Sequence, residues 1–280
     1  MEPGQQFQTV SSGWLGELQL TLNRDGDTTK IARRYSKAPL KLQRPFYPEG
    51  PRVCHGVLLH TAGGIAGGDR LQVNIALEEG ARALLTTAAA AKVYRSAGPP
   101  AQQRVTLAVG PGAGLEWLPQ ETILFNGARY HHHLQVALAA DATWMGWDVV
   151  RLGRSARQET FASGSWRSLT VVQQDSQPLW VDPQQLWGDS AAMTSPAGLH
   201  NAPVVGTFAA VGREVPRSLV DVCRQEAPAA DVGVTRLMKG LLCRYRGDST
   251  AQAKWWFEQA WGHLRQHYYG GRGHRPRVWP

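Results

Sequence analysis

The chain has 280 residues, of which 42% are hydrophobic, and a formal net charge of +8. This length supports a sizeable folded core, and no apolar run reaches the roughly 20 residues of a membrane-spanning helix. Lysine and arginine are scattered, apart from one short cluster within residues 272–277, and no nucleic-acid-binding motif accompanies them. An acidic protein partner explains this diffuse positive charge as well as nucleic acid does. We expect neither nucleic acid nor a membrane as a partner.

Cysteine usage and the N-terminus both point to the cytoplasm. The three cysteines are far apart and form no Cys-x-x-Cys pair, which argues against a zinc ribbon and a disulfide framework. The first residues lack a basic region followed by an apolar one, so the sequence predicts no signal peptide. We expect a cytoplasmic protein.

The first predicted element is a strand within residues 14–22, where apolar and polar residues alternate before a turn at Asp25-Gly26-Asp27. Pro45 and Pro48 then predict an extended surface path, because proline fixes the backbone and restricts the residue before it.

A glycine-rich loop follows at His60–Asp69, with four glycines between positions 63 and 68. Glycine permits backbone conformations that side chains forbid, so this loop is suited to close approach by a ligand or by another stretch of chain. Its glycine spacing fits a P-loop, but Asp69-Arg70 stand where a P-loop has Lys and Ser or Thr. The sequence therefore argues against phosphate binding here.

From residue 71 the chain repeats a pattern of alternating strand, short turn, small residue and second strand. The small residues are Ala81, Ala113 and Ala142, and the first strands begin near residues 71, 105 and 134. This period suits a stacked, solenoid-like β layer better than βαβ units, which need helices between their strands. We predict mostly β structure over residues 50–182.

The repeat also predicts where polar groups gather. Six residues after each small residue lie Thr87, Pro119 and Asp148. We therefore expect Thr86, Thr87, residues 119–121 and Asp148 to lie at one end of the stack.

The last third has an α+β pattern. A strand is predicted at 204–211, a helix from about Pro216 to Cys223, a strand at 241–245 and a helix from Ser249 to about His267. Residues 270–280 are expected to form a flexible tail, although Val278-Trp279 offer apolar groups for docking. We predict one mainly β domain over residues 1–280, with 183–269 as its α+β part.

Motifs for catalysis are sparse. No nucleophile elbow G-x-S-x-G occurs. His131 and His133 share one side of a predicted strand and are candidate ligands for nickel or zinc, with a plain surface tract as the alternative. Carboxylates in a β layer are costly unless they are paired, hydrogen-bonded or bound to a cation. The carboxylates in question are Asp69, Glu116, Glu121, Asp148, Glu159 and Asp182.

Several ordered motifs resemble the UreD family of urease accessory proteins, called UreH in some bacteria. The matching segments are residues 43–48, His60 with 63–69, 92–96, 115–121, 147–148, 152–154, 159–161 and 276–279. The resemblance extends over nearly the whole chain. It implies a predominantly β, non-enzymatic protein that joins UreF and the GTPase UreG on apo-urease and helps direct nickel into the active site.

By motif position, the resemblance associates Asp69, Asp148 and Asp182 with a transient nickel path and places Lys92 near it. Proline follows Asp182 where the family has arginine, so one possible ion partner is missing from the sequence. We expect no tightly bound cofactor. Two alternatives stay open: a metal-dependent hydrolase that uses the acidic residues with His131 and His133, and a β-sheet interaction platform that touches no metal.

Overall fold

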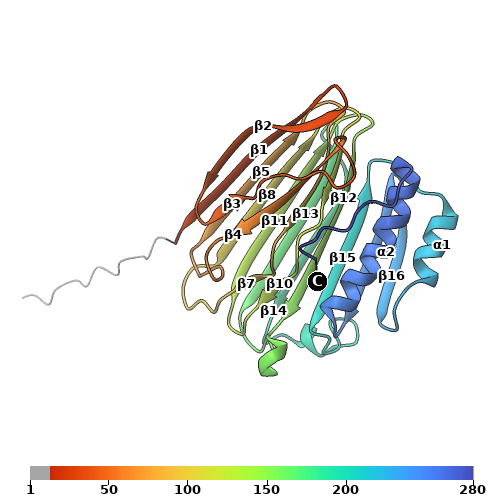
Figure 1. Cartoon of the computed structure of the whole chain (residues 1–280). Coiled ribbons are helices and arrows are strands. Elements are labelled where there is room, and N and C mark those ends of the chain that lie inside the picture. The colour runs from red at the N-terminus through yellow and green to blue at the C-terminus, as the bar shows by residue number, and fades with distance from the viewer. Residues whose placement is uncertain (1–12, 280) are drawn as a thin grey trace, which may run out of the picture.

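The computed structural model describes residues 13–279 and shows two stacked β-sheets with helices on one of them (Figure 1). The N-terminal segment, for which the sequence predicts no signal peptide, lies outside these residues. The first sheet, sheet A, has the strand order β14-β13-β11-β8-β5-β1-β2. Its strands are β1 (Leu15–Asp25), β2 (Thr28–Lys37), β5 (Arg70–Leu77), β8 (Ala101–Val109), β11 (Arg129–Leu138), β13 (Ser165–Gln174) and β14 (Gln177–Trp187).

The second sheet, sheet B, has the order β16-β17-β15-β12-β9-β6-β4-β3, with two short strands, β7 and β10, beside β12. Its strands are β3 (Leu40–Leu42), β4 (Val53–His60), β6 (Arg82–Thr87), β7 (Ala91–Val93), β9 (Gly114–Trp117), β10 (Thr122–Leu124), β12 (Thr143–Leu152), β15 (Val204–Val211), β16 (Asp231–Leu237) and β17 (Gly240–Gly247).

The chain alternates between the sheets in parallel coils, which confirms the mainly β, solenoid-like prediction. In sheet B, Arg82 pairs with Gly114, and Gly114 pairs with Thr143. The repeated alanines each precede one of these residues and are buried, with 0 to 1% exposed. The repeat therefore marks the point where each coil enters sheet B, since only a small residue fits there between stacked neighbours.

Between the sheets lies an apolar core built by strict alternation. In β5, Leu71, Val73, Ile75 and Leu77 are buried while Arg70, Gln72 and Asn74 are exposed. The inward residues of β1, β8 and β11 continue this core with those of sheet B. One face of each sheet is thus committed to the interior, and the outer face of sheet A carries polar side chains.

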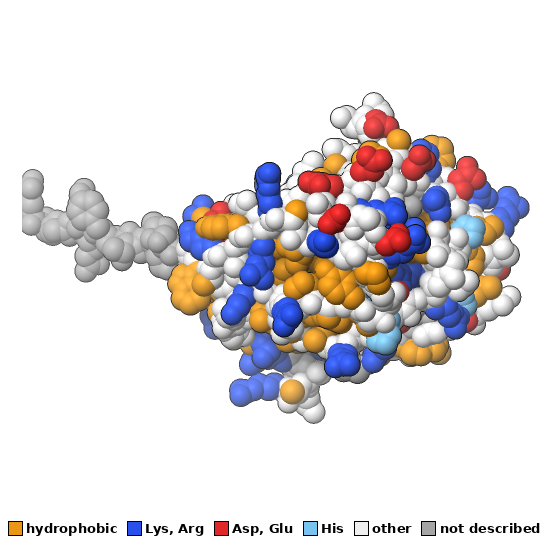
Figure 2. Space-filling view, turned by 45° about the horizontal axis from the view of Figure 1, so that its top comes forward, with side chains coloured by type: hydrophobic (Ala, Val, Ile, Leu, Met, Phe, Trp, Pro, Cys, Tyr) orange, Lys and Arg blue, Asp and Glu red, His pale blue; other side chains and the backbone are white. Residues whose placement is uncertain are grey.

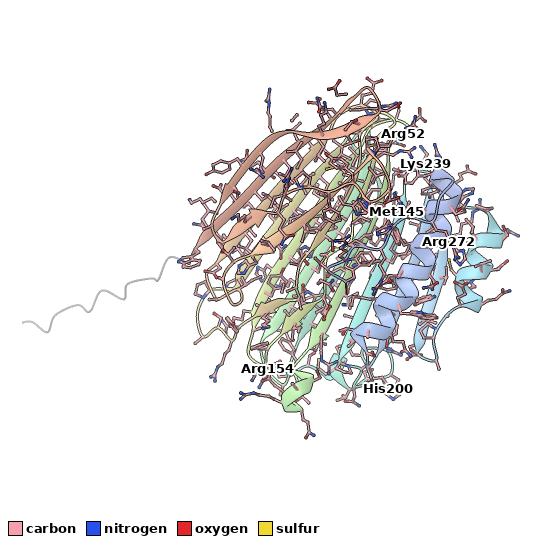
Figure 3. All side chains as sticks on the ribbon, viewed as in Figure 1. Arg52, Met145, Arg154, His200, Lys239 and Arg272 are labelled. Carbon is pink, nitrogen blue, oxygen red and sulfur yellow. The ribbon has the colours of Figure 1, made fainter. Side chains whose placement is uncertain are left out.

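Two helices, α1 (Arg217–Gln225) and α2 (Thr250–Tyr269), cover the outer face of sheet B. Ser249 caps α2 by accepting a hydrogen bond from the backbone N–H of Gln252, which confirms the predicted start. Met145 of β12 faces this helical layer (Figure 3), whereas Trp144 faces the other core. Two short 3-10 helices, η1 (Ser155–Arg157) and η2 (Ala191–Met193), lie in connections.

The C-terminal segment differs from the expected flexible tail at its described end. Trp279 is buried, with its ring centroid 5.0 Å from that of Trp147 and 5.8 Å from that of Trp261. Its indole N–H donates to the hydroxyl of Thr86 at 2.9 Å. The segment docks because a large aromatic ring fills a gap between sheet B and α2.

The glycine-rich loop packs against the chain itself. A Cβ on Gly67 would lie 2.1 Å from the hydroxyl oxygen of Ser96, and a Cβ on Gly64 would lie 2.7 Å from the ring of Tyr94. The sequence left open whether a ligand or another stretch of chain approaches this loop closely. The structure shows close approach by another stretch of chain.

Candidate functional site: a polar band between the sheets

The middle histidine of the triple, His132, points into the interior. Strand β11 places the even-numbered residues Tyr130 and Leu134 in the core, so His132 faces the same way. Its Nδ1 atom lies 3.7 Å from a carboxylate oxygen of Asp148 and 3.4 Å from the hydroxyl of Ser168. An imidazole of sheet A therefore lies close to a carboxylate of sheet B across the core.

Asp148 begins a row of polar side chains along sheet B. It pairs in register with Thr207 of β15, and Thr207 pairs with Arg244 of β17. The guanidinium of Arg244 donates to the Thr207 hydroxyl at 3.3 Å. The side chain of Asp148 is 28% exposed, so water reaches this carboxylate.

The last member of this row is Asp182, which lies on β14 of sheet A and is reached from sheet B through Arg244. Arg244 donates to its two carboxylate oxygens at 2.6 and 3.2 Å, and the amide of Gln184 donates at 2.8 Å. The Asp182 side chain is 9% exposed and that of Arg244 is 44% exposed. The cation that sequence reasoning found missing beside Asp182 thus comes from β17, 62 residues further along the chain.

A cavity of about 530 Å³ lies at the end of the core where the strands of sheet A begin. Its lining includes Thr87, Gln103, His60 and Lys92. Tyr130 links it to the row, because its hydroxyl donates to the amide oxygen of Gln103 at 2.6 Å and its ring stacks on His132. Burial raises the pKa of the Tyr130 hydroxyl, which therefore stays protonated as a donor.

We call this set the polar band. It crosses a mainly apolar core from the cavity to the edge strand β14. Its members are Gln103, Tyr130, His132, Asp148, Ser168, Asp182, Thr207 and Arg244. Sequence reasoning singled out only the two aspartates; the inward alternation of His132 with Tyr130 and Leu134 is the signal that points to the histidine.

His131 and His133 do share one side of β11, but it is the exterior of sheet A. Burial and the nearby guanidinium of Arg167 lower the pKa of His131, and burial and Arg104 lower that of His133. Within residues 13–279, no three His, Cys, Asp or Glu side chains are close enough to hold a metal together. The described residues thus do not assemble the acidic and histidine cluster that a metal-dependent hydrolase requires.

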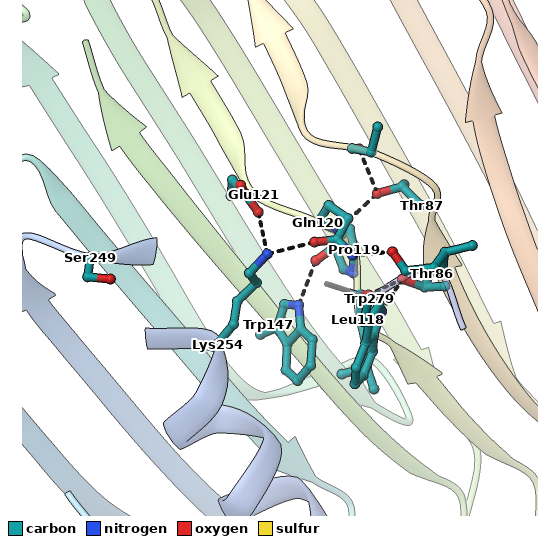
Figure 4. Close-up of polar contacts among 12 residues, drawn as sticks. Thr86, Thr87, Leu118, Pro119, Gln120, Glu121, Trp147, Ser249, Lys254 and Trp279 are labelled. Carbon is teal, nitrogen blue, oxygen red and sulfur yellow. Dashed lines mark hydrogen bonds and ion pairs between the residues drawn. The ribbon is translucent and has the colours of Figure 1, made fainter. Parts of the chain in front are cut away.

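The predicted convergence of polar groups is present in part: Thr86, Gln120 and Glu121 meet on the helix-covered face of sheet B (Figure 4), whereas Asp148 faces sheet A. Lys254 of α2 donates to Gln120 and to Glu121, both at 2.7 Å. Thr86 donates to the carbonyl of Leu118 at 2.6 Å, and the backbone N–H of Gln120 donates to the Thr87 hydroxyl at 2.9 Å. These contacts fasten α2 and the strand ends together.

Glu116 is part of a buried ion network on that face. Its oxygens accept from the guanidinium of Arg265 at 2.7 Å and from the indole of Trp261 at 2.8 Å. Arg265 also pairs with Glu49, which in turn contacts His55 at 2.6 Å. Arg265 lies 149 residues from Glu116 and 216 residues from Glu49, so these carboxylates hold distant parts of the chain together.

The other predicted residues lie in loops. Glu159 pairs with Arg154 and accepts the backbone N–H of Asn126 at 2.8 Å, and the hydrogen bond from Arg154 lowers its pKa. The oxygens of Asp69 accept the backbone N–H groups of Trp14 and Ala66, each at 2.8 Å. These contacts order the loops at the end of the sheets that holds the cavity.

No helix in the described part of the chain is both long and apolar enough to cross a membrane.

Comparison with known proteins places the chain in a family. The family model described as "UreD urease accessory protein" matches residues 15–280. The chain is 49% identical to the urease accessory protein UreD of Nostoc punctiforme, with 96% of this chain and 97% of the relative aligned. The same-named protein of Acaryochloris marina is 48% identical, with 98% of each chain aligned. That of Dechloromonas aromatica is 41% identical, with 96% of this chain and 95% of the relative aligned. The chain therefore belongs to the UreD family of urease accessory proteins.

Proposed function

We propose that this protein is a urease maturation factor that helps to conduct nickel into the urease active site along the polar band. It acts as a non-enzymatic scaffold in the cytoplasm and binds apo-urease together with UreF and the GTPase UreG. Family membership and the names of the relatives support a role in urease maturation.

The observation that carries the metal part of the proposal is the polar band itself. Burying polar groups in an apolar core costs free energy unless they are paired or serve a ligand. Here Asp148 and His132 face each other at 3.7 Å, longer than a direct hydrogen bond, so neither group saturates the other. Carboxylate oxygen and imidazole nitrogen are both suitable nickel ligands.

The arrangement of the polar band favours transient binding of a metal ion over tight binding. A tight site for a transition metal surrounds it with three or four protein ligands, whereas within residues 13–279 no group of three potential ligands is found. Pairs of ligands spaced along a row bind a cation weakly and release it to the next pair. Asp69 and Lys92, which the resemblance associates with the path, lie at the cavity end of the molecule, and Lys92 lines the cavity.

GTP hydrolysis is assigned to a partner, because Asp69-Arg70 replace the lysine and hydroxyl residues that a P-loop needs for phosphate and magnesium. Binding of nickel is transient, and no tightly held cofactor is part of the proposal.

The test is co-expression of Asp148→Asn with urease and its other accessory proteins. The change keeps the size of the side chain and removes its charge. We expect urease activity and nickel per urease active site to fall together by about tenfold. The matched control is Asp175→Asn, which removes one charge from an exposed turn outside the band and leaves both values unchanged.

Two further measurements make the result decisive. Co-purification of the variant with apo-urease and the accessory proteins must be unchanged, since the proposal places the defect in nickel transfer and not in assembly. Full activation by both Asp148→Asn and Asp148→Ala would overturn the metal path and leave the interaction platform as the function.

A further inference from the structure

A second hollow, of about 600 Å³, lies on the outer face of sheet A at the end where β8, β11 and β13 begin. Alternation places Arg129 and His131 of β11 on this face, with Arg167 of β13 beside His131 in register. Arg95 adds a third guanidinium from the loop after β7. Three arginines of different segments therefore converge on one concave surface.

None of these arginines is neutralised by a carboxylate within residues 13–279. Arg129 donates to the carbonyl of Gly98 at 3.2 Å, and the guanidinium of Arg167 lies 5.9 Å from the ring centre of Trp187. Asp189 is the one acidic residue in the lining, so three positive groups face one negative group. Guanidinium groups that are exposed and without an ion partner are suited to carboxylates, which they bind in a bidentate manner.

The distribution of charge along the sheets strengthens this asymmetry. Turns at the opposite end of sheet A carry Asp25, Asp27, Glu78 and Glu79. In the view of Figure 2, acidic side chains gather in the upper part, and lysine and arginine lie both among them and over the remainder. Asp25 and Asp27 form ion pairs with Lys30, Arg24 and Arg52, so the cations of that end are partnered. An acidic partner is therefore attracted to the hollow rather than to the far end.

Exposed apolar side chains flank the hollow along the edge strand β14. Trp187 is 44% exposed, Val181 is 49% exposed, and Leu169 of β13 is 36% exposed. A small bound anion would leave these apolar side chains exposed to water, whereas a bound protein segment would bury them. Tryptophan and arginine together are the residues that most often dominate the binding energy of protein interfaces.

We propose that Arg95, Arg129, Arg167 and Trp187 form a docking site for an acidic segment of a protein partner. Carboxylates of the segment bind the arginines, and an apolar side chain next to them packs on Trp187. This site lies on the outside of sheet A, whereas the polar band lies inside, so the proposal does not depend on nickel transfer.

The binding test uses the full chain and a fluorescently labelled peptide of alternating glutamate and leucine residues. We expect saturable binding that weakens by about tenfold in Arg129→Gln/Arg167→Gln. The matched control is Arg70→Gln/Arg104→Gln, which removes the same charge from the same face outside the hollow and changes the affinity by less than about threefold. Equal weakening in the two double variants would show unspecific charge attraction and overturn the site.

Trp187→Ala tests the apolar half of the proposal. It should weaken the affinity for the glutamate–leucine peptide by about fivefold and leave the affinity for a glutamate–serine peptide nearly unchanged. A competition experiment distinguishes a protein partner from other anions. Inorganic phosphate or a single-stranded oligonucleotide is added at the same concentration of charge as the peptide. Displacement of the peptide by either would show a general anion site and contradict a protein partner.

The same Arg129→Gln/Arg167→Gln variant also distinguishes this site from the nickel path. In co-expression it should reduce co-purification of a partner, whereas Asp148→Asn should reduce nickel in urease with the complex intact. Unchanged assembly, together with unchanged peptide binding, would refute the docking site and leave the path proposal standing.

Discussion

The two faces of sheet B handle charge in opposite ways. On the helix-covered face, Glu116 and Arg265 are almost fully buried and bonded to each other at 2.7 Å. On the face toward sheet A, His132 and Asp148 are 3.7 Å apart and Arg244 remains 44% exposed. The contrast separates Glu116, which is consumed by an ion pair, from Asp148, which water reaches.

The strongest test of this contrast is Arg265→Met. The change leaves Glu116 and Glu49 buried without their cation, and breaking such a pair costs about 3–5 kcal/mol of unfolding free energy. Urea unfolding followed by tryptophan fluorescence measures the loss. The double variant Glu116→Leu/Arg265→Met should recover part of it, because no buried charge at position 116 is then unpaired. A loss below about 1 kcal/mol in the single variant would contradict the structural role of the network.

Trp279→Ala tests whether the helical layer depends on the C-terminal segment. The indole packs on Trp147 and Trp261 and bonds to Thr86, so we expect about 3 kcal/mol of destabilisation. Trp255→Ala is the control, since that ring is 51% exposed and its loss should change stability by no more than about 0.5 kcal/mol. Equal, small effects would mean that the segment is a flexible tail after all.

The network also predicts a pH dependence. Burial works against ionisation of Glu49, but hydrogen bonds from His55 and Arg265 prevail and lower its pKa from 4.5 to about 2. A carboxyl group whose pKa is lower in the folded than in the unfolded protein stabilises the fold at pH values above its unfolded pKa. This stabilisation is lost as the pH falls from 4.5 towards 2. Glu49→Gln should therefore flatten the fall in unfolding free energy over this interval. A fall as steep as in the parent would assign the acid sensitivity to other groups.

The smallest effect is expected on the other face. Asp182→Asn weakens an ion pair whose arginine is 44% exposed, so solvent screens the pair and the unfolding free energy should fall by less than about 1 kcal/mol. Chemical unfolding compares it directly with Arg265→Met. A loss as large as that of Arg265→Met would show that the polar band is a structural network like the one beneath α2.

Local patterns in the sequence predicted the fold. Alternation and the spacing of Ala81, Ala113 and Ala142 predicted the stacked coils, and the limits of β15 agree with the predicted strand at 204–211. These features are local because the period of a strand and the size limit at a coil entry act within a few residues. Strands β2 and β16 were not predicted individually.

The candidate site was less accessible to the same reasoning. The partners of Glu121 and Asp182 are Lys254 and Arg244, which lie 133 and 62 residues away. Spacing along the chain carries no information about such pairs when coils and helices fold back on one another.

The family, the β layers and the shared side of His131 and His133 follow from motifs and from the strand period, which are local features of the chain. That this side is the exterior, that His132 meets Asp148 inside and that Glu116 pairs with Arg265 follow from how the layers pack. The physical reason is that a strand fixes the alternation of its side chains, while the packing of the second sheet and of α2 determines which face is buried and which charges are neutralised.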